Sequence, residues 1–348
     1  MHISGRWQTW YAAPAIVRHP LDATGTASVS FELQTKRWPA KRALLLVHGI
    51  GNAAPGDYVS LMEQVTAMLG AEAANTAIYQ LWYDQVNDWF TAKTDLGSLL
   101  GDAVQSLGTQ IADPDIGDTI AEMLGDVLWP VLLADARTAV REAYLAQVKQ
   151  MVVDGIDSGV PARRQRLSII CHSLGCFHTY EALHHMALFP SHALQPATHE
   201  VRFDNVVFMA SPVQLIRTVA NALGGLVPNK RWLYSVQGEA LSIPFETTLT
   251  GLQVPSVRRW VSITGNLDPV GGHFFRQLAP WAYMNVPTQL SRIDDQAALH
   301  LDSKQQLALV LRDSRRDKLP PLITATNPHS WENYMRLNAA ELREWTTV

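Results

Sequence analysis

Midway along the chain the sequence reads Leu167-Ser168-Ile169-Ile170-Cys171-His172-Ser173-Leu174-Gly175-Cys176. An apolar run leads into a serine, a glycine follows two positions later, and apolar residues then recur at helical spacing. This pattern predicts a strand, a sharp turn and a helix, with the Ser173 hydroxyl at the turn. Such a turn pushes a serine hydroxyl out of a sheet, and it directs the first N–H groups of the helix toward the same space.

The turn departs at one position from the G-x-S-x-G pattern of nucleophilic serines, because Cys171 replaces the first glycine. Cysteine is small, so we interpret the stretch as a variant of the same turn. The alternative is a buried strand-to-helix junction with an inert serine. Neither Cys171 nor Cys176 occupies the exposed position of the turn, so a cysteine nucleophile is not expected.

Composition places the chain among globular proteins, with 47% hydrophobic and 17% charged residues. The net charge of -4, from 28 basic and 32 acidic residues, gives no electrostatic sign of nucleic-acid binding. No apolar run approaches the roughly 20 residues of a membrane span, and the first residues do not resemble a secretory leader. Two cysteines form no disulfide framework. We therefore expect a cytoplasmic protein without a transmembrane segment.

The remaining pattern predicts a mostly parallel sheet flanked by helices. The apolar run 43–47 does not alternate, which is typical of a strand covered on both faces, and it ends in the glycine-rich turn His48-Gly49-Ile50-Gly51. Strand, helix and strand in succession indicate parallel pairing. The predicted elements are an edge strand at 28–35, a helix at 57–69, buried strands at 77–83, 202–209 and 259–263, an irregular stretch at 226–256, a last strand near 289–293 and a terminal helix opening at 327–331.

Between residues 84 and 165 the apolar residues follow helical spacing alone. We expect a helical insertion there, before the strand that carries Ser173. The insertion is either a cap over a hydrophobic substrate or ordinary packed structure. No internal repeat or linker interrupts the chain, so residues 1–348 are expected to form a single α/β domain.

A nucleophilic serine needs a base, a carboxylate that orients the base, and N–H donors for the oxyanion. Asp268 lies in the turn after the predicted strand at 259–263, and His329 lies after the last predicted strand. In the alternative interpretation, Asp268 simply caps its Asp-Pro turn. His273 and His300 compete with His329 for the part of the base. We favour Ser173, Asp268 and His329.

The other histidines are interpreted as structural residues. His172 neighbours the serine, but is expected to point away from it and pack. His48 is expected to brace the glycine-rich turn by hydrogen bonding. The pair His184 and His185 lies mid-helix without a third ligand, so we expect no metal site.

These motifs resemble those of the α/β-hydrolase superfamily, in particular its lipase and serine esterase branch. The similar segments are Val47–Gly51, Cys171–Gly175, Asn266–Val270 and His329–Trp331. The resemblance implies the α/β-hydrolase fold from about Ala43 onward. It also implies that the backbone N–H groups of Ile50 and Leu174 form the oxyanion hole.

The expected function is hydrolysis of carboxylic esters through an acyl-enzyme intermediate on Ser173, with a small-molecule or lipid-like substrate and no cofactor. Ester cleavage is preferred over other acyl chemistry by analogy with the common use of the fold. The competing hypothesis is a non-catalytic scaffold of the same fold that binds a hydrophobic ligand or a protein partner through the helical insertion.

Overall fold

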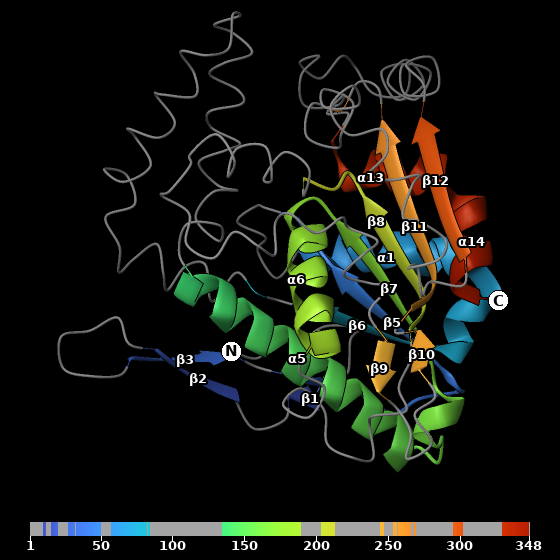
Figure 1. The fold of residues 1–348 in the computed structure, drawn as a ribbon. Coiled ribbons are helices and arrows are strands. Elements are labelled where there is room, and N and C mark those ends of the chain that lie inside the picture. Colours follow the sequence, from blue (N-terminus) through green and yellow to red (C-terminus); the bar gives the residue numbers. More distant parts are fainter. Residues whose placement is uncertain are drawn as a thin grey trace, which may run out of the picture.

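The computed structural model of the chain describes residues 10–11, 15–19, 27–31, 33–49, 57–81, 83, 134–188, 203–212, 244–246, 253–255, 257–265, 268, 295–301 and 329–347. Most of these residues lie in strands and helices (Figure 1). The strands are β1 (Trp10–Tyr11), β2 (Ala15–His19), β3 (Ala27–Phe31), β4 (Gln34–Thr35), β5 (Arg42–Val47), β6 (Thr76–Leu81), β7 (Arg166–His172), β8 (Phe203–Met209), β9 (Pro244–Glu246), β10 (Gln253–Pro255), β11 (Val257–Gly265) and β12 (Asp295–Leu301). The α-helices are α1 (Asp57–Leu69), α5 (Ala134–Asp157), α6 (Leu174–Leu188), α13 (Trp331–Leu337) and α14 (Ala339–Thr347), and two short 3-10 helices span Gly70–Asn75 and Ala162–Arg164.

Six strands form the central sheet in the order β12-β11-β8-β7-β5-β6. Every neighbouring pair in this sheet is parallel. Strand β7, which leads to Ser173, therefore lies between β5 and β8 in the interior of the sheet. With helices on both faces and a sharp strand-to-helix turn at the serine, the chain has the α/β-hydrolase fold that its motifs imply.

The two faces of the sheet bury alternate residues of the same strands. In β5, Ala43, Leu45 and Val47 belong to one core cluster, whereas Leu44 and Leu46 belong to the other. This division explains why the run 43–47 is apolar without alternation, as a strand buried on both faces must be. Each fully buried aliphatic side chain of this kind contributes about 1.5–3 kcal/mol to folding.

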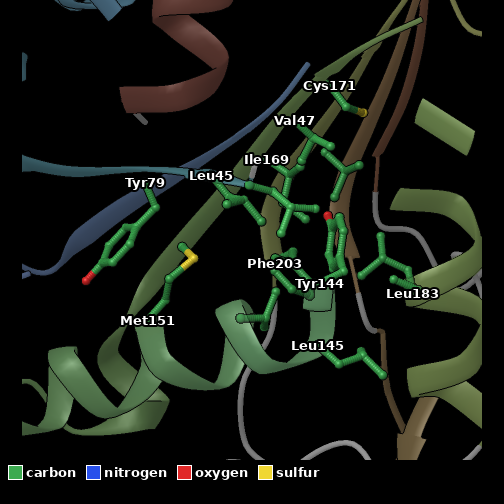
Figure 2. Packing of buried hydrophobic residues seen from close by; sticks show 14 of the residues in the cluster. Leu45, Val47, Tyr79, Tyr144, Leu145, Met151, Ile169, Cys171, Leu183 and Phe203 are labelled. Atoms are coloured by element: carbon green, nitrogen blue, oxygen red, sulfur yellow. The ribbon is translucent and has the colours of Figure 1, made fainter. Parts of the chain in front are cut away.

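The first core cluster lies between the sheet and the helices α5 and α6 (Figure 1). Figure 2 shows part of it, in which Leu45 and Ile169 of the sheet face Tyr144 of α5. The buried positions Val140, Tyr144, Val148 and Val152 recur every four residues and form the inner face of α5. The helix ends before Gly159, which has a left-handed φ of 84°, and Val160 N–H donates to Gly155 O at 2.8 Å.

The second core cluster covers the opposite face with α1, α13 and α14. Met62 and Val65 of α1 pack there with Trp331 and Tyr334 of α13. The C-terminal helices are thus part of the core beneath the sheet, and they bring the residue that precedes them, His329, to the end of β7.

A buried polar network fastens the segment after β4 to the end of α5. The Tyr79 hydroxyl donates to Asp154 Oδ2 at 2.6 Å, and the Trp38 indole N–H donates to the Tyr79 oxygen at 2.9 Å. The Lys36 backbone N–H donates to the same Asp154 oxygen at 2.6 Å, while the Lys36 ammonium donates to the carbonyl of Ile78. These contacts join β6 to the last turn of α5.

Most predicted elements are confirmed, and the bounds of the helix at 57–69 agree with α1. The strand predicted at 28–35 is divided into β3, which pairs with β2, and β4, which pairs with β1, and neither belongs to the central sheet. The predicted last strand near 289–293 falls outside the described residues, and the strand that pairs with β11 is β12, at 295–301. The stretch 226–256, predicted as irregular, contains the short antiparallel pair β9 and β10. The single predicted terminal helix is divided at Asn338 into α13 and α14. Of the expected insertion at 84–165, residues 84–133 lie outside the described part of the chain, and α5 occupies most of the rest.

Candidate active site

The turn at Ser173 joins the end of β7 directly to the start of α6. Ser173 has a φ of 51°, a left-handed conformation that is unusual for a residue with a side chain. Its N–H donates to Met209 O on the neighbouring strand at 3.0 Å, and the Cys176 N–H donates to Ser173 O at 2.9 Å. These bonds hold the strained residue in place, which is the arrangement expected of a strand-to-helix turn that projects a nucleophile.

Two glycines allow the turn after β5 to lie against the serine. A Cβ atom on Gly175 would lie 2.5 Å from Val47 O and closer still to His48 O, both of them backbone atoms. A Cβ atom on Gly49 would lie 2.7 Å from the Cβ of Ser173. The turn that contains His48 and Gly49 therefore lies so close to the turn at Ser173 that only glycine fits at positions 49 and 175.

His329 lies two residues before α13 and reaches the serine with one ring nitrogen. Its Nε2 is 2.8 Å from Ser173 Oγ, and its Nδ1 is 2.9 Å from both carboxylate oxygens of Asp268. Asp268 is fully buried. Because a carboxylate only accepts hydrogen bonds, Nδ1 carries the proton and donates, which leaves Nε2 to accept from the serine hydroxyl.

This arrangement has the parts of a proton-transfer site. A neutral imidazole that accepts from Ser173 can take the hydroxyl proton as the oxygen attacks an electrophile. The buried Asp268 carboxylate then faces the imidazolium that forms and stabilises its charge. The structure thus brings together the three residues Ser173, Asp268 and His329 within hydrogen-bond distance.

The competing histidines lie elsewhere or outside the described residues. His300 belongs to β12, where its Cα pairs in register with Thr264. His273 lies outside the described part of the chain. His184 and His185 are in α6. Among the described residues, no three His, Cys, Asp or Glu side chains form a group that could hold a metal ion.

Two further contacts at the site were not foreseeable from the sequence. The Tyr334 hydroxyl donates to Asp268 Oδ2 at 2.6 Å, so the buried carboxylate has a second donor besides His329. The Nε2–H of His172 donates to the main-chain oxygen of His329 at 2.6 Å. Helical spacing marks Tyr334 as buried, and His172 is adjacent to the serine, but neither pattern identifies the atom that each side chain contacts.

His172 is neutral in this environment. Burial lowers its pKa to about 3, and the positive charge that His329 can carry acts in the same direction, whereas Asp268 opposes the shift. The ring centroids of His172 and His329 are 4.9 Å apart. A neutral imidazole beside the base donates a hydrogen bond without adding a positive charge.

The turn after β5 is braced from two sides. His48 Nδ1–H donates to Gly49 O at 2.6 Å, which is the kind of hydrogen bond expected of this histidine. The Tyr83 hydroxyl lies 2.9 Å from His48 O and 3.0 Å from Gly49 O, and its ring stacks on the His48 ring with the centroids 4.4 Å apart. Ile50, one of the two expected oxyanion donors, lies outside the described residues.

The second expected oxyanion donor, Leu174, is the first residue of α6. The N–H groups in the first turn of a helix have no partner within that helix, and in α6 the Cys176 N–H donates to Ser173 O at 2.9 Å. The helix begins immediately after the serine. Its N-terminal N–H groups therefore lie beside Ser173.

Both thiols near the turn are buried and free. Cys171 Sγ–H donates to Val207 O at 3.2 Å, and Cys176 Sγ–H donates to Met209 O at 3.4 Å. Burial raises the pKa of the Cys176 thiol, with the neighbouring Cys171 acting in the same direction. Cys171 lies in the first core cluster (Figure 2), so the position that glycine holds in the usual motif has room here for a side chain.

Comparison with known proteins gives distant structural likeness alone. No protein-family model and no curated protein matches the chain. Carboxyl esterase 2 from the fungus Tuber melanosporum is 13% identical and aligns over 98% of this chain and 89% of its own, with a TM-score of 0.37. The hyperthermophilic esterase from the archaeon Pyrobaculum calidifontis is 11% identical over 98% and 88%, with a TM-score of 0.36. A proline iminopeptidase-related protein from Thermus thermophilus is 13% identical over 96% and 97%, with a TM-score of 0.31.

The fold of this chain follows from its own strand order and from the turn at Ser173. Among the described residues, no helix is long and apolar enough to cross a membrane.

Proposed function

We propose that the protein is a serine hydrolase that cleaves carboxylic esters, with Ser173 as nucleophile, His329 as general base and acid, and Asp268 as the orienting carboxylate. One observation carries the proposal: both ring nitrogens of His329 are engaged, Nε2 with Ser173 Oγ at 2.8 Å and Nδ1 with Asp268 at 2.9 Å. The proposed substrate is a small-molecule or lipid-like ester, as in the lipase and esterase branch. The proposed location of the protein is the cytoplasm.

In the proposed first half-reaction, the Ser173 oxygen bonds to the carbonyl carbon while its proton passes to His329 Nε2. The carbonyl oxygen becomes an oxyanion, for which the N–H groups of Leu174 and Ile50 are the proposed donors. As the tetrahedral intermediate collapses, the bond to the alcohol oxygen breaks and Nε2–H returns the proton to that oxygen. The alcohol leaves, and the acyl group remains on Ser173.

In the second half-reaction, water replaces the alcohol. His329 Nε2 accepts a proton from the water as its oxygen attacks the acyl carbon, and then gives that proton back to Ser173 Oγ as the ester bond to the enzyme breaks. The carboxylic acid is released. Asp268 stays ionised throughout and holds Nδ1–H, with Tyr334 as its second donor.

A fluorophosphonate probe tests the proposal, because it reacts covalently with an activated serine. We expect the wild-type protein to be labelled and to hydrolyse p-nitrophenyl esters, and Ser173→Ala to lose both properties while its circular dichroism stays unchanged. A series of acyl chain lengths then defines the substrate. A folded wild-type protein that neither takes the label nor turns over any ester would favour the non-catalytic scaffold instead.

A further inference from the structure

His172 ends β7 and immediately precedes the proposed nucleophile. Its Nε2–H donates to the main-chain oxygen of His329 at 2.6 Å. The next residue, Ser173, contacts the side chain of His329, with 2.8 Å between Oγ and Nε2. The consecutive residues His172 and Ser173 therefore contact the backbone and the ring of the proposed base, respectively.

The hydrogen bond to the backbone limits how the base can move. His329 lies ahead of α13, and its ring reaches Ser173 only if its own backbone stays close to the end of β7. The contact to Asp268 fixes the direction of the ring and does not involve the backbone of His329. The bond from His172 connects the backbone of His329 directly to the strand that carries the nucleophile.

The His172 ring is enclosed, which fixes the direction in which it donates. It lies in edge contact with Trp331 at 5.8 Å between ring centroids, and at 6.0 Å from Tyr334. Its Nδ1 faces Gly49, since a Cβ atom on that glycine would lie 3.1 Å away. The side chain is almost wholly buried, and a rotation about χ1 would bring it against these neighbours.

The donor at this position also has to be uncharged. The proposed reaction creates a positive charge on His329, whose ring centroid lies 4.9 Å from that of His172. A second positive charge at that distance would disfavour the imidazolium. Burial keeps the His172 pKa at about 3, so the ring stays neutral while it donates.

From this geometry, and resting on the proposed function, we propose that His172 is a positioning residue for the hydrolytic reaction. Its neutral Nε2–H fixes the backbone of His329 so that the base stays within reach of the Ser173 hydroxyl. His172 does not contact the substrate or exchange a proton. It acts through the placement of the base.

Three substitutions separate the hydrogen bond from the packing. His172→Gln places an uncharged N–H donor at about the reach of Nε2, and His172→Met has the same length without a donor. His172→Asn keeps a donor that is too short to reach His329, and it tests the same point if the methionine variant does not fold. The number of active sites in each preparation is counted by the end point of fluorophosphonate labelling.

We expect His172→Met and His172→Asn to lower kcat per titrated site by about 10- to 100-fold, as small misplacements of a reacting group do. KM should stay within about twofold, because bound substrate does not contact His172. The rate of fluorophosphonate labelling should fall by a similar factor. His172→Gln should recover most of both rates.

The proposal is overturned if the methionine and glutamine variants have the same kcat per titrated site, or if the loss lies in KM or in the fraction of active sites. Labelling of the wild type distinguishes a failure of the positioning role from a failure of the hydrolase function. A labelled wild type with unaffected His172 variants removes the positioning role alone. A wild type that is neither labelled nor active removes the proposed hydrolase function and this inference with it.

Discussion

Substitution of Gly175 by alanine is expected to displace the backbone beside Ser173. The added Cβ would lie 2.5 Å from Val47 O and closer still to His48 O, about 1 Å inside the ~3.4 Å at which ordinary contact begins. Both contacts are to backbone, so no side chain can rotate away. Either α6 moves off the sheet or the turn after β5 moves off the serine.

The size of the effect follows from the overlap. Forcing one methyl group into a closely packed position costs about 1–3 kcal/mol, and the double backbone contact favours the upper part of that range. For a cooperative chain of this length, that loss lowers Tm by about 1–4 °C. A shift of about 1 Å in the turn that contains Gly49 should also lower kcat by roughly 100-fold, because the turn lies against Ser173.

Cys171→Ala is the matched control, on the other arm of the same turn. Its thiol is buried in the first core cluster and donates to Val207 O at 3.2 Å, so its removal should cost about 1–2 kcal/mol without moving the turn after β5. We expect similar losses of Tm for the two variants, and a large loss of p-nitrophenyl ester turnover for Gly175→Ala alone. Wild-type kcat and Tm in Gly175→Ala would refute the close-approach argument.

Three further predictions concern the base, the carboxylate and a distant lysine. His329→Ala should lower kcat about 10⁴- to 10⁶-fold, whereas His300→Ala should stay within about twofold of wild type; the reverse outcome in a steady-state assay would move the base to β12. Tyr334→Phe removes a hydrogen-bond donor from the buried Asp268, so we expect a loss of about 1.5–3 kcal/mol in the free energy of urea unfolding and a lower kcat. Unchanged values of both would show that the hydroxyl is dispensable. Burial lowers the pKa of Lys36 from 10.5 to about 8, although Asp154 opposes the shift. Between pH 8 and pH 10 the unfolded chain therefore binds more protons than the folded one, and the free energy of unfolding should rise with pH. Lys36→Met should lack this rise in urea unfolding, and an equal slope in both proteins would contradict the assignment.

The sequence was sufficient to predict the turn at Ser173 because several local signals coincide there. The apolar run 167–170, the serine, Gly175 and the following helical spacing all require the same strand, turn and helix. Asp268 and His329 were identifiable because chemistry at the end of a parallel sheet draws on turns that follow strands. The structure brings these three residues together, although 156 residues separate Ser173 from His329.

The hydrogen-bond partners of individual side chains could not be predicted from the sequence, because they depend on where the tip of each side chain lies in the folded protein. Periodicity places Tyr334 on the inner face of a helix, but only the packing of α13 against the sheet brings its hydroxyl to Asp268. His172 is expected from the sequence to pack away from the serine. Its hydrogen bond to His329 O depends on where a turn 157 positions later in the sequence lies, which the local pattern does not indicate. The predicted strand near 289–293 lies outside the described residues. The strand β12 was not predicted, because it opens with Asp295 and Gln296, which are uncommon in strands.

The assembly of the site from distant parts of the chain has a consequence for refolding. The sheet strands β5, β7 and β8 can pair, and α5 and α6 can cover them, before α13 and α14 dock on the other face. A refolding intermediate of this kind would have nearly native far-ultraviolet circular dichroism, yet it would lack His329 at the end of β7. Arg42 of β5 pairs with Arg166 of β7, 124 positions away, whereas Arg343 of α14 donates to Met68 O, 275 positions away. Closing the longer loop costs more conformational entropy, so we expect the C-terminal helices to dock later. Recovery of activity after dilution from denaturant should therefore lag behind recovery of secondary structure, and the lag measures the docking of the C-terminal helices.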